Sequence, residues 1–213
     1  RRLDFSNNQL VDCSGGVFEH LSKLKALIID NNSLQHVQFK GLTSLTTLSL
    51  ANNQLNYLND MSDLKSIVYL DLSGNRLEGK LSSFQRYSYL TTIFIAGFDQ
   101  ICKLKSLKVL DLGSNAITST RSTFWKNFKS LARLPKLQYL NLAGNPCTTT
   151  VNKYRLFVIN EFKQIKFLDW VEITKEERME ATRLDAEGEW QEKVSWFFIF
   201  LVPVYQQLLK TIP

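Results

Sequence analysis

The sequence has 213 residues, of which 44% are hydrophobic and 22% charged, a composition that favours a folded chain with a substantial core and excludes a mostly disordered one. The formal net charge is +6, and no stretch approaches the roughly 20 apolar residues of a membrane-spanning helix. Cys13, Cys102 and Cys147 are too few and too far apart for a disulfide framework or a zinc site. We expect them to be small buried hydrophobic residues in a reducing compartment. Because the sequence begins at Arg1, we expect a fragment of a longer protein.

One eight-residue pattern recurs along the first 147 residues. Its copies are LDFSNNQL (3–10), LIIDNNSL (27–34), LSLANNQL (48–55), LDLSGNRL (70–77), LDLGSNAI (110–117) and LNLAGNPC (140–147). The alternating apolar residues predict short parallel strands whose leucines point into the core. The recurring asparagine stands where the chain turns, and there its amide can satisfy backbone groups that burial would leave unpaired. These asparagines are Asn8, Asn32, Asn53, Asn75, Asn115 and Asn145.

The pattern resembles the L-x-x-L-x-L-x-x-N-x-L signature of leucine-rich repeats. The resemblance implies an α/β solenoid with a curved parallel sheet on its concave side and loops or short helices on its convex side. No repeat buries its own apolar face, so stacking of repeats must supply the stability. We expect about seven repeats over residues 1–147, one of them degenerate at 93–104.

Two intervals between repeats are irregular. The leading apolar residues are 21 to 24 residues apart up to Ile93, but only 17 residues separate Ile93 from Leu110. We interpret the short interval as the loss of about five residues between Gly97 and Phe98.

The following interval, from Leu110 to Leu140, is 30 residues long. Its extra residues include Phe124, Phe128 and Leu131, whose spacing predicts one face of a helix, with Ser122 as its cap.

Residues 148–185 change from the repeat pattern to a mixed one. Apolar residues at helical spacing are followed by a strand-like segment at 165–170, and Thr174 with Glu177 forms a capping box that opens a charged helix. The segment resembles the C-terminal cap of intracellular leucine-rich-repeat proteins, on the pairs Asn145-Pro146, Tyr154-Arg155 and Leu168-Asp169. That group includes protein phosphatase regulatory subunits, a spliceosomal ribonucleoprotein subunit and axonemal proteins of cilia. The resemblance implies that residues 148–185 cover the open end of the repeat array.

The last part of the chain, 186–213, departs from this group. Residues 196–209 are too hydrophobic to lie in water alone. They either pack back on the solenoid or dock on a partner.

Catalytic and metal-binding patterns are weak. Residues 74–80 come close to a phosphate-binding loop, but Leu81 stands where the magnesium-binding hydroxyl is required. His20 and His36 have no neighbour at metal-ligand or nucleophile spacing. We therefore predict no catalysis, no cofactor, no metal and no small-molecule substrate.

Two columns of strand residues are expected to point to the concave side, beside the buried leucines. Aromatic residues at such surface positions favour a partner that covers them, and carboxylates offer acceptors to a basic group. The predicted contacts are Tyr69, Phe94, Tyr139, Ile28, Val109, Asp71 and Asp111. The alternative is that the aromatic rings only shield neighbouring strands.

Positive charge is concentrated between residues 103 and 136, where Asp111 is the only acidic residue. The patch consists of Lys103, Lys105, Lys108, Arg121, Lys126, Lys129, Arg133 and Lys136. It can attract phosphates or an acidic partner, or it can be an ordinary solvated convex surface.

Two functions follow. In the first, the chain is a non-catalytic scaffold that binds proteins in a large cytoplasmic assembly, with the cytoskeleton or a cilium as possible sites. In the second, it is a nuclear ribonucleoprotein subunit with its basic patch near RNA. Neither function involves a membrane.

Overall fold

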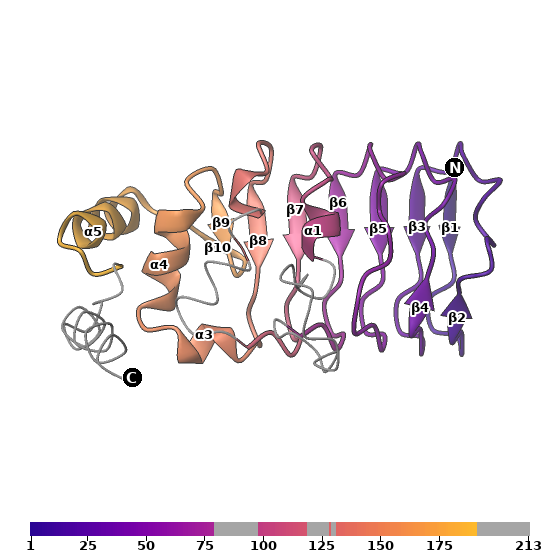
Figure 1. Cartoon of the computed structure of the whole chain (residues 1–213), viewed down its shortest axis with the longest axis horizontal. Coiled ribbons are helices and arrows are strands. Elements are labelled where there is room, and N and C mark those ends of the chain that lie inside the picture. Colours follow the sequence, from indigo (N-terminus) through magenta and orange to yellow (C-terminus); the bar gives the residue numbers. More distant parts are fainter. Residues whose placement is uncertain (79–97, 119–127, 129–130, 191–213) are drawn as a thin grey trace, which may run out of the picture.

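The computed structural model describes residues 1–78, 98–118, 128 and 131–190. Eight strands form one sheet, and they follow each other across it in chain order (Figure 1). All neighbours are parallel except the last pair, which is antiparallel. The strands are β1 (Arg2–Asp4), β3 (Ala26–Ile28), β5 (Thr47–Ser49), β6 (Tyr69–Asp71), β7 (Val109–Asp111), β8 (Tyr139–Asn141), β9 (Phe167–Leu168) and β10 (Val171–Glu172). The predicted repeat solenoid is thus confirmed.

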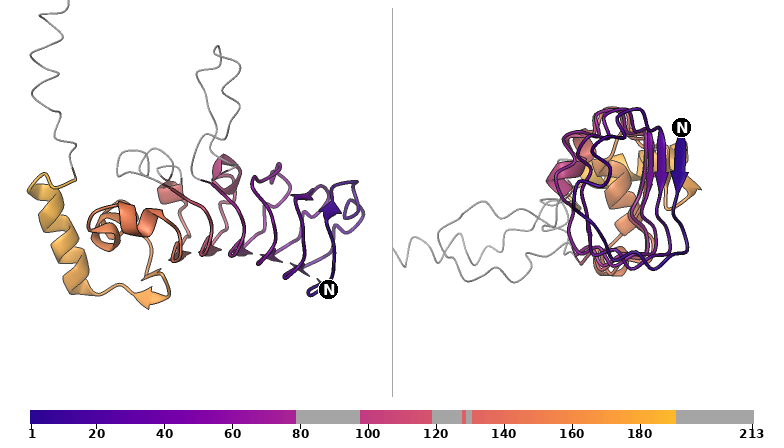
Figure 2. Two further views of the ribbon diagram at one scale, coloured as in Figure 1. Left: turned by 90° about the horizontal axis from the view of Figure 1, so that it is seen from below. Right: turned by 90° about the vertical axis from the view of Figure 1, so that its right-hand side faces the viewer.

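The strands line one side of the molecule, and the loops and short helices line the other (Figure 2). The convex side carries α1 (Phe98–Ile101) and the 3₁₀ helix η1 (Leu131–Arg133). Two short strands, β2 (Asp12–Cys13) and β4 (His36–Val37), form a second parallel pair near the N-terminus.

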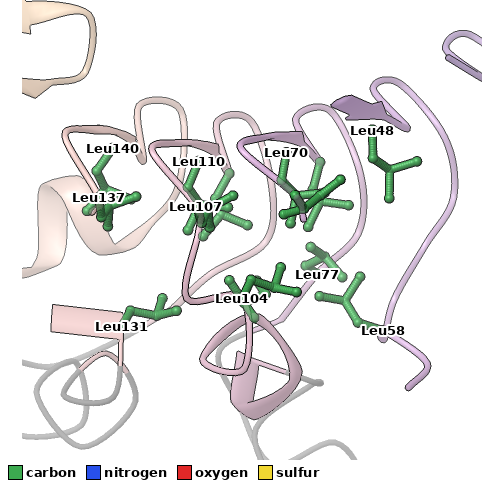
Figure 3. Close-up of a cluster of buried hydrophobic side chains, with 14 of the residues drawn as sticks. Leu48, Leu58, Leu70, Leu77, Leu104, Leu107, Leu110, Leu131, Leu137 and Leu140 are labelled. Carbon is green, nitrogen blue, oxygen red and sulfur yellow. The ribbon is translucent and has the colours of Figure 1, made fainter. Parts of the chain in front are cut away.

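The core is a stack of leucines, one set from each repeat (Figure 3). From β3 to β8 the central residue of each strand, such as Leu48, Leu70 or Leu110, pairs in register with its neighbours and is at most 1% exposed. Each fully buried leucine stabilises the fold by about 2 kcal/mol through removal of apolar surface from water. Because these side chains contact the repeats on either side, the stability belongs to the stack.

Five of the six recurring asparagines form a buried hydrogen-bond ladder, as predicted, whereas Asn8 of the first repeat is exposed. The Asn75 amide donates to the carbonyl oxygen of Leu50 in the preceding repeat (2.9 Å) and to those of Leu72 and Ser73 in its own turn. Its Oδ1 accepts from the Leu55 backbone N–H at 2.9 Å. Asn32, Asn53, Asn115 and Asn145 accept in the same way from the preceding repeat.

The residue before each of these asparagines has a left-handed backbone. It is Asn at positions 7, 31 and 52, Gly at 74 and 144, and Ser at 114, with φ between 50° and 73°. Asparagine and glycine tolerate this conformation better than other residues do. The paired Asn-Asn and Gly-Asn sequences of the repeats therefore mark the turn that follows each strand.

The predicted repeat at 93–104 is wrong. Strand β6 pairs directly with β7, residue for residue from Tyr69 and Val109 onward, so the sheet has no place for a strand led by Ile93 between them. The interval from Leu70 to Leu110 is 40 residues, and without the 19 residues 79–97 it is 21, an ordinary repeat length.

The 17-residue interval from Ile93 to Leu110 is therefore not the length of a repeat, because the repeat before Leu110 begins at Leu70. The prediction of missing residues depended on that interval. Gly97, one side of the predicted gap, lies outside the described residues, and Phe98 begins α1 on the convex side.

The predicted helix around Phe128 is partly described. Phe128 is helical and fully buried, and Leu131 is buried at the start of η1. Ser122 and Phe124 lie outside the described residues.

The C-terminal segment contains α3 (Cys147–Thr150), α4 (Tyr154–Glu161), the β9–β10 turn and α5 (Lys175–Ala186). The predicted capping box is confirmed, since the Thr174 hydroxyl accepts from Glu177 N–H while the Glu177 carboxylate accepts from Thr174 N–H. The division into 1–147, 148–185 and 186–213 remains a proposal. The tail at 196–209 lies outside the described residues.

The three cysteines form no disulfide in the described part of the chain, and two of them are buried as expected. Cys13 and Cys147 lie in the core, and burial raises the pKa of both thiols. Cys102 is only partly buried, at the start of the turn that follows α1.

Candidate protein-interaction surface

The strand register brings most of the predicted contacts onto one surface, the exposed concave face of the sheet. Tyr69, Val109 and Tyr139 lie side by side in one column, and Phe167 of β9 continues it. The second column contains Ile28, Ser49, Asp71, Asp111 and Asn141. Residues of both columns flank the buried leucine of each strand, and side chains alternate along a strand, so both columns share the face opposite the core.

The sheet position that the sequence predicted for Phe94 does not exist. The sequence predicted it in the concave columns between Tyr69 and Val109, but those two residues are direct partners. Phe94 itself lies outside the described residues.

Asp71 and Asp111 place two carboxylates on adjacent strands. They are register partners, and neighbouring strands are about 4.8 Å apart. Asp71 accepts hydrogen bonds from the Ser73 N–H and hydroxyl at 2.9 and 2.7 Å. Asp111 Oδ1 accepts from Gly113 N–H and from the Asn141 amide, both at 2.8 Å.

Asp111 is 6% exposed, and burial, with a further contribution from Asp71, raises the pKa of its carboxyl group. The two groups are therefore held close together at an electrostatic cost. None of the ion pairs formed by the described residues involves either one.

Tyr69 lies beside this pair. Its hydroxyl donates to Asp71 Oδ2 at 3.3 Å. Burial and the negative charges of Asp71, Asp111 and Asp30 raise the pKa of the phenol to about 12. The region around β6 and β7 is consequently a patch of negative potential with an aromatic ring in it.

An aromatic platform, Tyr139, Phe167 and Trp170, adjoins the acidic pair at the C-terminal end of the sheet. The Tyr139 and Phe167 rings stack with centroids 4.5 Å apart and planes 4° from parallel. Trp170 is 58% exposed. The platform residues line a shallow hollow together with Val109, Leu110, Leu140 and Asn141.

Trp170 owes its position to an unusual backbone. Asp169 and Trp170 have φ of +52° and +63°, two consecutive left-handed residues that are not glycine. They form the two-residue loop of the β9–β10 hairpin, and tight hairpin turns of this length commonly have positive φ at both central residues. Asp169 is held by hydrogen bonding, since its Oδ1 accepts from Leu142 N–H at 2.8 Å.

The sequence analysis missed Phe167 and Trp170. Phe167 could have been found, because aligning Leu168 with Leu140 puts it in the first concave column. Trp170 could not have been placed from the strand pattern, because its direction depends on the left-handed turn after Leu168.

The basic patch occupies a different edge. Five of its residues are exposed. Lys103, Lys105, Lys108 and Lys136 lie in the segments that lead into β7 and β8, and Arg133 ends η1. Lys103 pairs with Asp60 at 3.3 Å. Arg121, Lys126 and Lys129 lie outside the described residues.

The structure extends this basic edge along the sheet. Further exposed lysines occupy the turns into β3, β6 and β9; these are Lys23, Lys25, Lys65, Lys163 and Lys166. The rim of the sheet where the strands begin is therefore basic at β3 and from β6 to β9, whereas residues 41–46 before β5 carry no lysine or arginine. We call this edge, with Lys105, Lys108 and Lys136, the lysine rim. It lies at the strand starts, whereas Asp71 and Asp111 lie at the strand ends.

In the part of the chain that the structure describes, no three His, Cys, Asp or Glu side chains gather as a metal site would require. The same residues include no helix long and apolar enough to cross a bilayer.

Comparison with known proteins identifies the family. A leucine-rich-repeat family model matches residues 69–191, more than half of the chain, and a second one matches residues 33–77. The chain belongs to the leucine-rich-repeat family. Repeat proteins of this kind present an extended concave surface to protein partners, and they are generally not catalysts.

Three similar proteins are informative. A probable inactive serine/threonine-protein kinase of Dictyostelium discoideum is 40% identical over 195 residues, which is 91% of this chain and 9% of that protein. The U2 small nuclear ribonucleoprotein A′ of Arabidopsis thaliana is 34% identical over 128 residues, 59% of this chain and 50% of that protein. The crystal structure of the Drosophila melanogaster SNF/U2A′ complex covers 100% of this chain and 88% of that one, with a TM-score of 0.50 and 18% identity.

These relatives confirm the resemblance to a spliceosomal ribonucleoprotein subunit, and the solved structure shares the fold. The chain spans about a tenth of the Dictyostelium protein and half of the Arabidopsis one.

Proposed function

We propose that the chain is a non-catalytic scaffold that binds a protein partner on its concave face, as a subunit of a larger intracellular assembly. The observation that carries the proposal is the aromatic platform beside the acidic pair. Two stacked rings and a tryptophan that is 58% exposed lie on the face that repeat proteins use for binding. Exposed aromatic side chains of this kind dominate the energy of protein interfaces.

The hairpin turn supports the same surface. Asp169 and Trp170 form the two-residue loop between β9 and β10, and this loop places Trp170 beside Tyr139 and Phe167. If the aromatic rings served only to shield strands, Trp170 would not need to be exposed.

The test is affinity purification of the chain from native material, with quantitative mass spectrometry of the proteins that accompany it. Tyr139→Ala and Trp170→Ala should each reduce the recovery of the true partner at least tenfold, because interface aromatics contribute about 2 kcal/mol or more. Met179→Ala is the matched control, since Met179 is 73% exposed on α5. Recovery that is equal for all variants would exclude the concave face as the binding surface.

For this function we propose the cytoplasm as the compartment, with the cytoskeleton or a cilium as possible sites. Imaging of the tagged full-length protein tests the location, and an exclusively nuclear signal would contradict it.

The second candidate is a nuclear ribonucleoprotein subunit. Two observations favour it, the lysine rim and the 34% identity to a ribonucleoprotein protein. The rim would lie near RNA phosphates while the concave face holds a protein. Lys105→Glu with Lys108→Glu should abolish RNA binding at low salt, and the wild-type affinity should fall steeply between 50 and 200 mM salt, about a hundredfold for a handful of phosphate contacts. No measurable RNA binding at low salt would remove this candidate.

A further inference from the structure

The charge of the concave face selects among partners. We propose that the segment bound there carries an arginine whose guanidinium lies against Asp71 and Asp111, with an apolar side chain of the same segment packed on the aromatic platform. This inference rests on the proposed function and names the chemistry of its partner.

The first argument is the uncompensated charge. Asp71 and Asp111 are register partners, and like charges directly opposite on adjacent strands destabilise a sheet. Asp111 is almost fully buried, and no ion pair of the described residues relieves it. A cation from a partner would turn the repulsion into two charge-assisted hydrogen bonds.

The second argument is the geometry of the acceptors. Asp71 Oδ1 and Asp111 Oδ1 accept hydrogen bonds from the turns that follow their own strands, and Asp111 Oδ1 also accepts one from Asn141 of the neighbouring strand β8. Asp71 Oδ2 faces the Tyr69 hydroxyl at a long 3.3 Å. A planar guanidinium has five donors in a fork that can bridge two carboxylates and stack on an aromatic ring, whereas a lysine ammonium cannot do both.

The third argument is continuity between the acidic pair and the platform. Asn141 lines the platform hollow, and its amide donates to Asp111 Oδ1 at 2.8 Å. The acidic pair spans β6 and β7, and the stacked rings span β8 and β9. Their centres are therefore two strand spacings apart, or roughly 10 Å.

That separation predicts the spacing in the partner. Residues seven apart in a helix are about 10.5 Å apart along its axis, and residues three apart in an extended chain are about 10 Å apart. The partner should therefore carry its arginine and its apolar residue at one of these two spacings, on a segment that crosses the strands. A nucleic acid does not suit this surface, because its phosphates would be repelled by the carboxylates.

The probe is a library of random 15-residue peptides displayed on phage and selected on the full 213-residue chain. The proposal expects enriched peptides to contain arginine with an apolar residue three or seven positions away. Affinities of the synthetic peptides are then measured for the wild type and for Asp71→Asn/Asp111→Asn, which should bind at least tenfold more weakly. An equal change of charge at distant exposed positions, Asp60→Asn/Asp185→Asn, is the control and should leave binding unchanged.

A double-mutant cycle tests whether the peptide arginine contacts Asp71 and Asp111 directly or is only attracted by them at long range. Replacing the peptide arginine by glutamine should weaken binding to the wild type tenfold, and it should have little further effect on Asp71→Asn/Asp111→Asn. Replacement by lysine should weaken binding severalfold.

Three outcomes would overturn the inference. Selected peptides could lack basic residues, or the Asp71→Asn/Asp111→Asn variant could bind them as the wild type does; if Trp170→Ala still abolished binding, the proposed function would survive. Sedimentation could also show a dimer that Trp170→Ala dissociates, in which case a second copy occupies the face. If Tyr139→Ala and Trp170→Ala also left binding of every peptide unchanged, the proposed function itself would fail.

Discussion

Asp111 occupies a position where a neutral residue would suit the fold better. Its carboxylate is buried beside Asp71, and both burial and the neighbouring charge favour its protonated form. Asparagine has nearly the same shape and can accept the hydrogen bonds from Gly113 and Asn141 that Asp111 Oδ1 now accepts. A residue that costs stability at a binding surface is a common sign of function.

We therefore predict that Asp111→Asn increases the free energy of unfolding by about 0.5–1 kcal/mol at pH 7, because it removes a like-charge pair. Urea denaturation followed by circular dichroism measures the change. Asp185→Asn, on the exposed surface of α5, is the control and should have almost no effect. A clear loss of stability in Asp111→Asn would show that the carboxylate is needed for the fold.

The gain in the free energy of unfolding that we predict for Asp111→Asn should depend on pH. The pKa of Asp111 is raised in the folded state, so its protonated form is favoured there. The wild type is therefore relatively more stable below the ordinary aspartate pKa of 3.8, and it loses this stability as pH rises through the raised pKa. The difference between variant and wild type should shrink as the solution is acidified through this range, which denaturation at a series of pH values will check.

The asparagine ladder permits a second test with a matched control inside the chain. Asn75→Ala leaves the buried Leu55 N–H and several carbonyl oxygens without partners, and it should lower the free energy of unfolding by about 2–4 kcal/mol. Asn8 has the same place in the first repeat, but it is exposed and bonds only to Phe5 and Ser6. Asn8→Ala should cost less than about 1 kcal/mol. Equal losses by thermal denaturation would contradict the role assigned to burial.

At the scale of elements, one arginine joins most of the C-terminal segment. Arg155 of α4 donates to both carboxylate oxygens of Glu177 in α5, at 2.6 and 3.0 Å, and to the backbone oxygens of Leu168 and Glu172 in β9 and β10. The same residue thereby fixes the turn that carries Trp170. The Tyr-Arg and Leu-Asp pairs seen in the sequence are thus parts of one contact region.

Arg155→Lys keeps the positive charge but loses the planar guanidinium that donates to both carboxylate oxygens of Glu177. We therefore expect α5 to open more often, with a loss of about 1–2 kcal/mol in local stability. Hydrogen exchange of the α5 amides measures this, while amides of β5 should stay protected as the control.

The Arg155 contact should also weaken in acid. The pKa of Glu177 is lowered mainly by its hydrogen bond from Arg155, so its contribution is present above the ordinary glutamate pKa of 4.5 and is lost as pH falls through the lowered value. Exchange in α5 that is unchanged in Arg155→Lys would mean that packing of Ala181 and Leu184 alone holds the helix.

At the scale of the whole molecule, the direct pairing of β6 with β7 predicts that the sheet forms without residues 79–97. Replacing them by a glycine-serine linker of equal length should change the free energy of unfolding by less than about 1 kcal/mol. If 92–94 were instead a repeat strand, the replacement would remove a whole repeat from the stack, and stability would fall by several kcal/mol. Denaturation of the two proteins decides between these arrangements.

The repeats were predictable because each of their features depends on residues close together in the sequence. A leucine alternation, a left-handed turn residue and an asparagine recur together at positions such as 48–53 and 70–75, and each is demanded by the backbone at that point. The sequence failed where pairing between distant segments decides the outcome. Ile93 has neighbours that resemble a repeat, yet the partner of Leu70 is Leu110.

The concave site was predictable to the same extent. Register in a solenoid follows from the repeat, so Asp111 could be placed beside Asn141 in advance. The direct pairing of Asp71 with Asp111 required the structure, because the sequence placed residues 92–94 between them. Trp170 depends on two backbone angles outside the repeat, which strand periodicity does not encode. The charge of Asp111 was visible in the sequence, whereas its burial required the structure.

The one-dimensional order of the strands has a mechanical consequence. Strand β1 has a single neighbour, and each later repeat is held only by the ones beside it. Under tension applied to its two ends, such a chain should yield in steps rather than all at once. A repeat of 22 residues, the interval from Leu48 to Leu70, would release a length of about 75 Å. The molecule would then behave as an extensible tether, in which the contacts of Arg155 hold the C-terminal segment together.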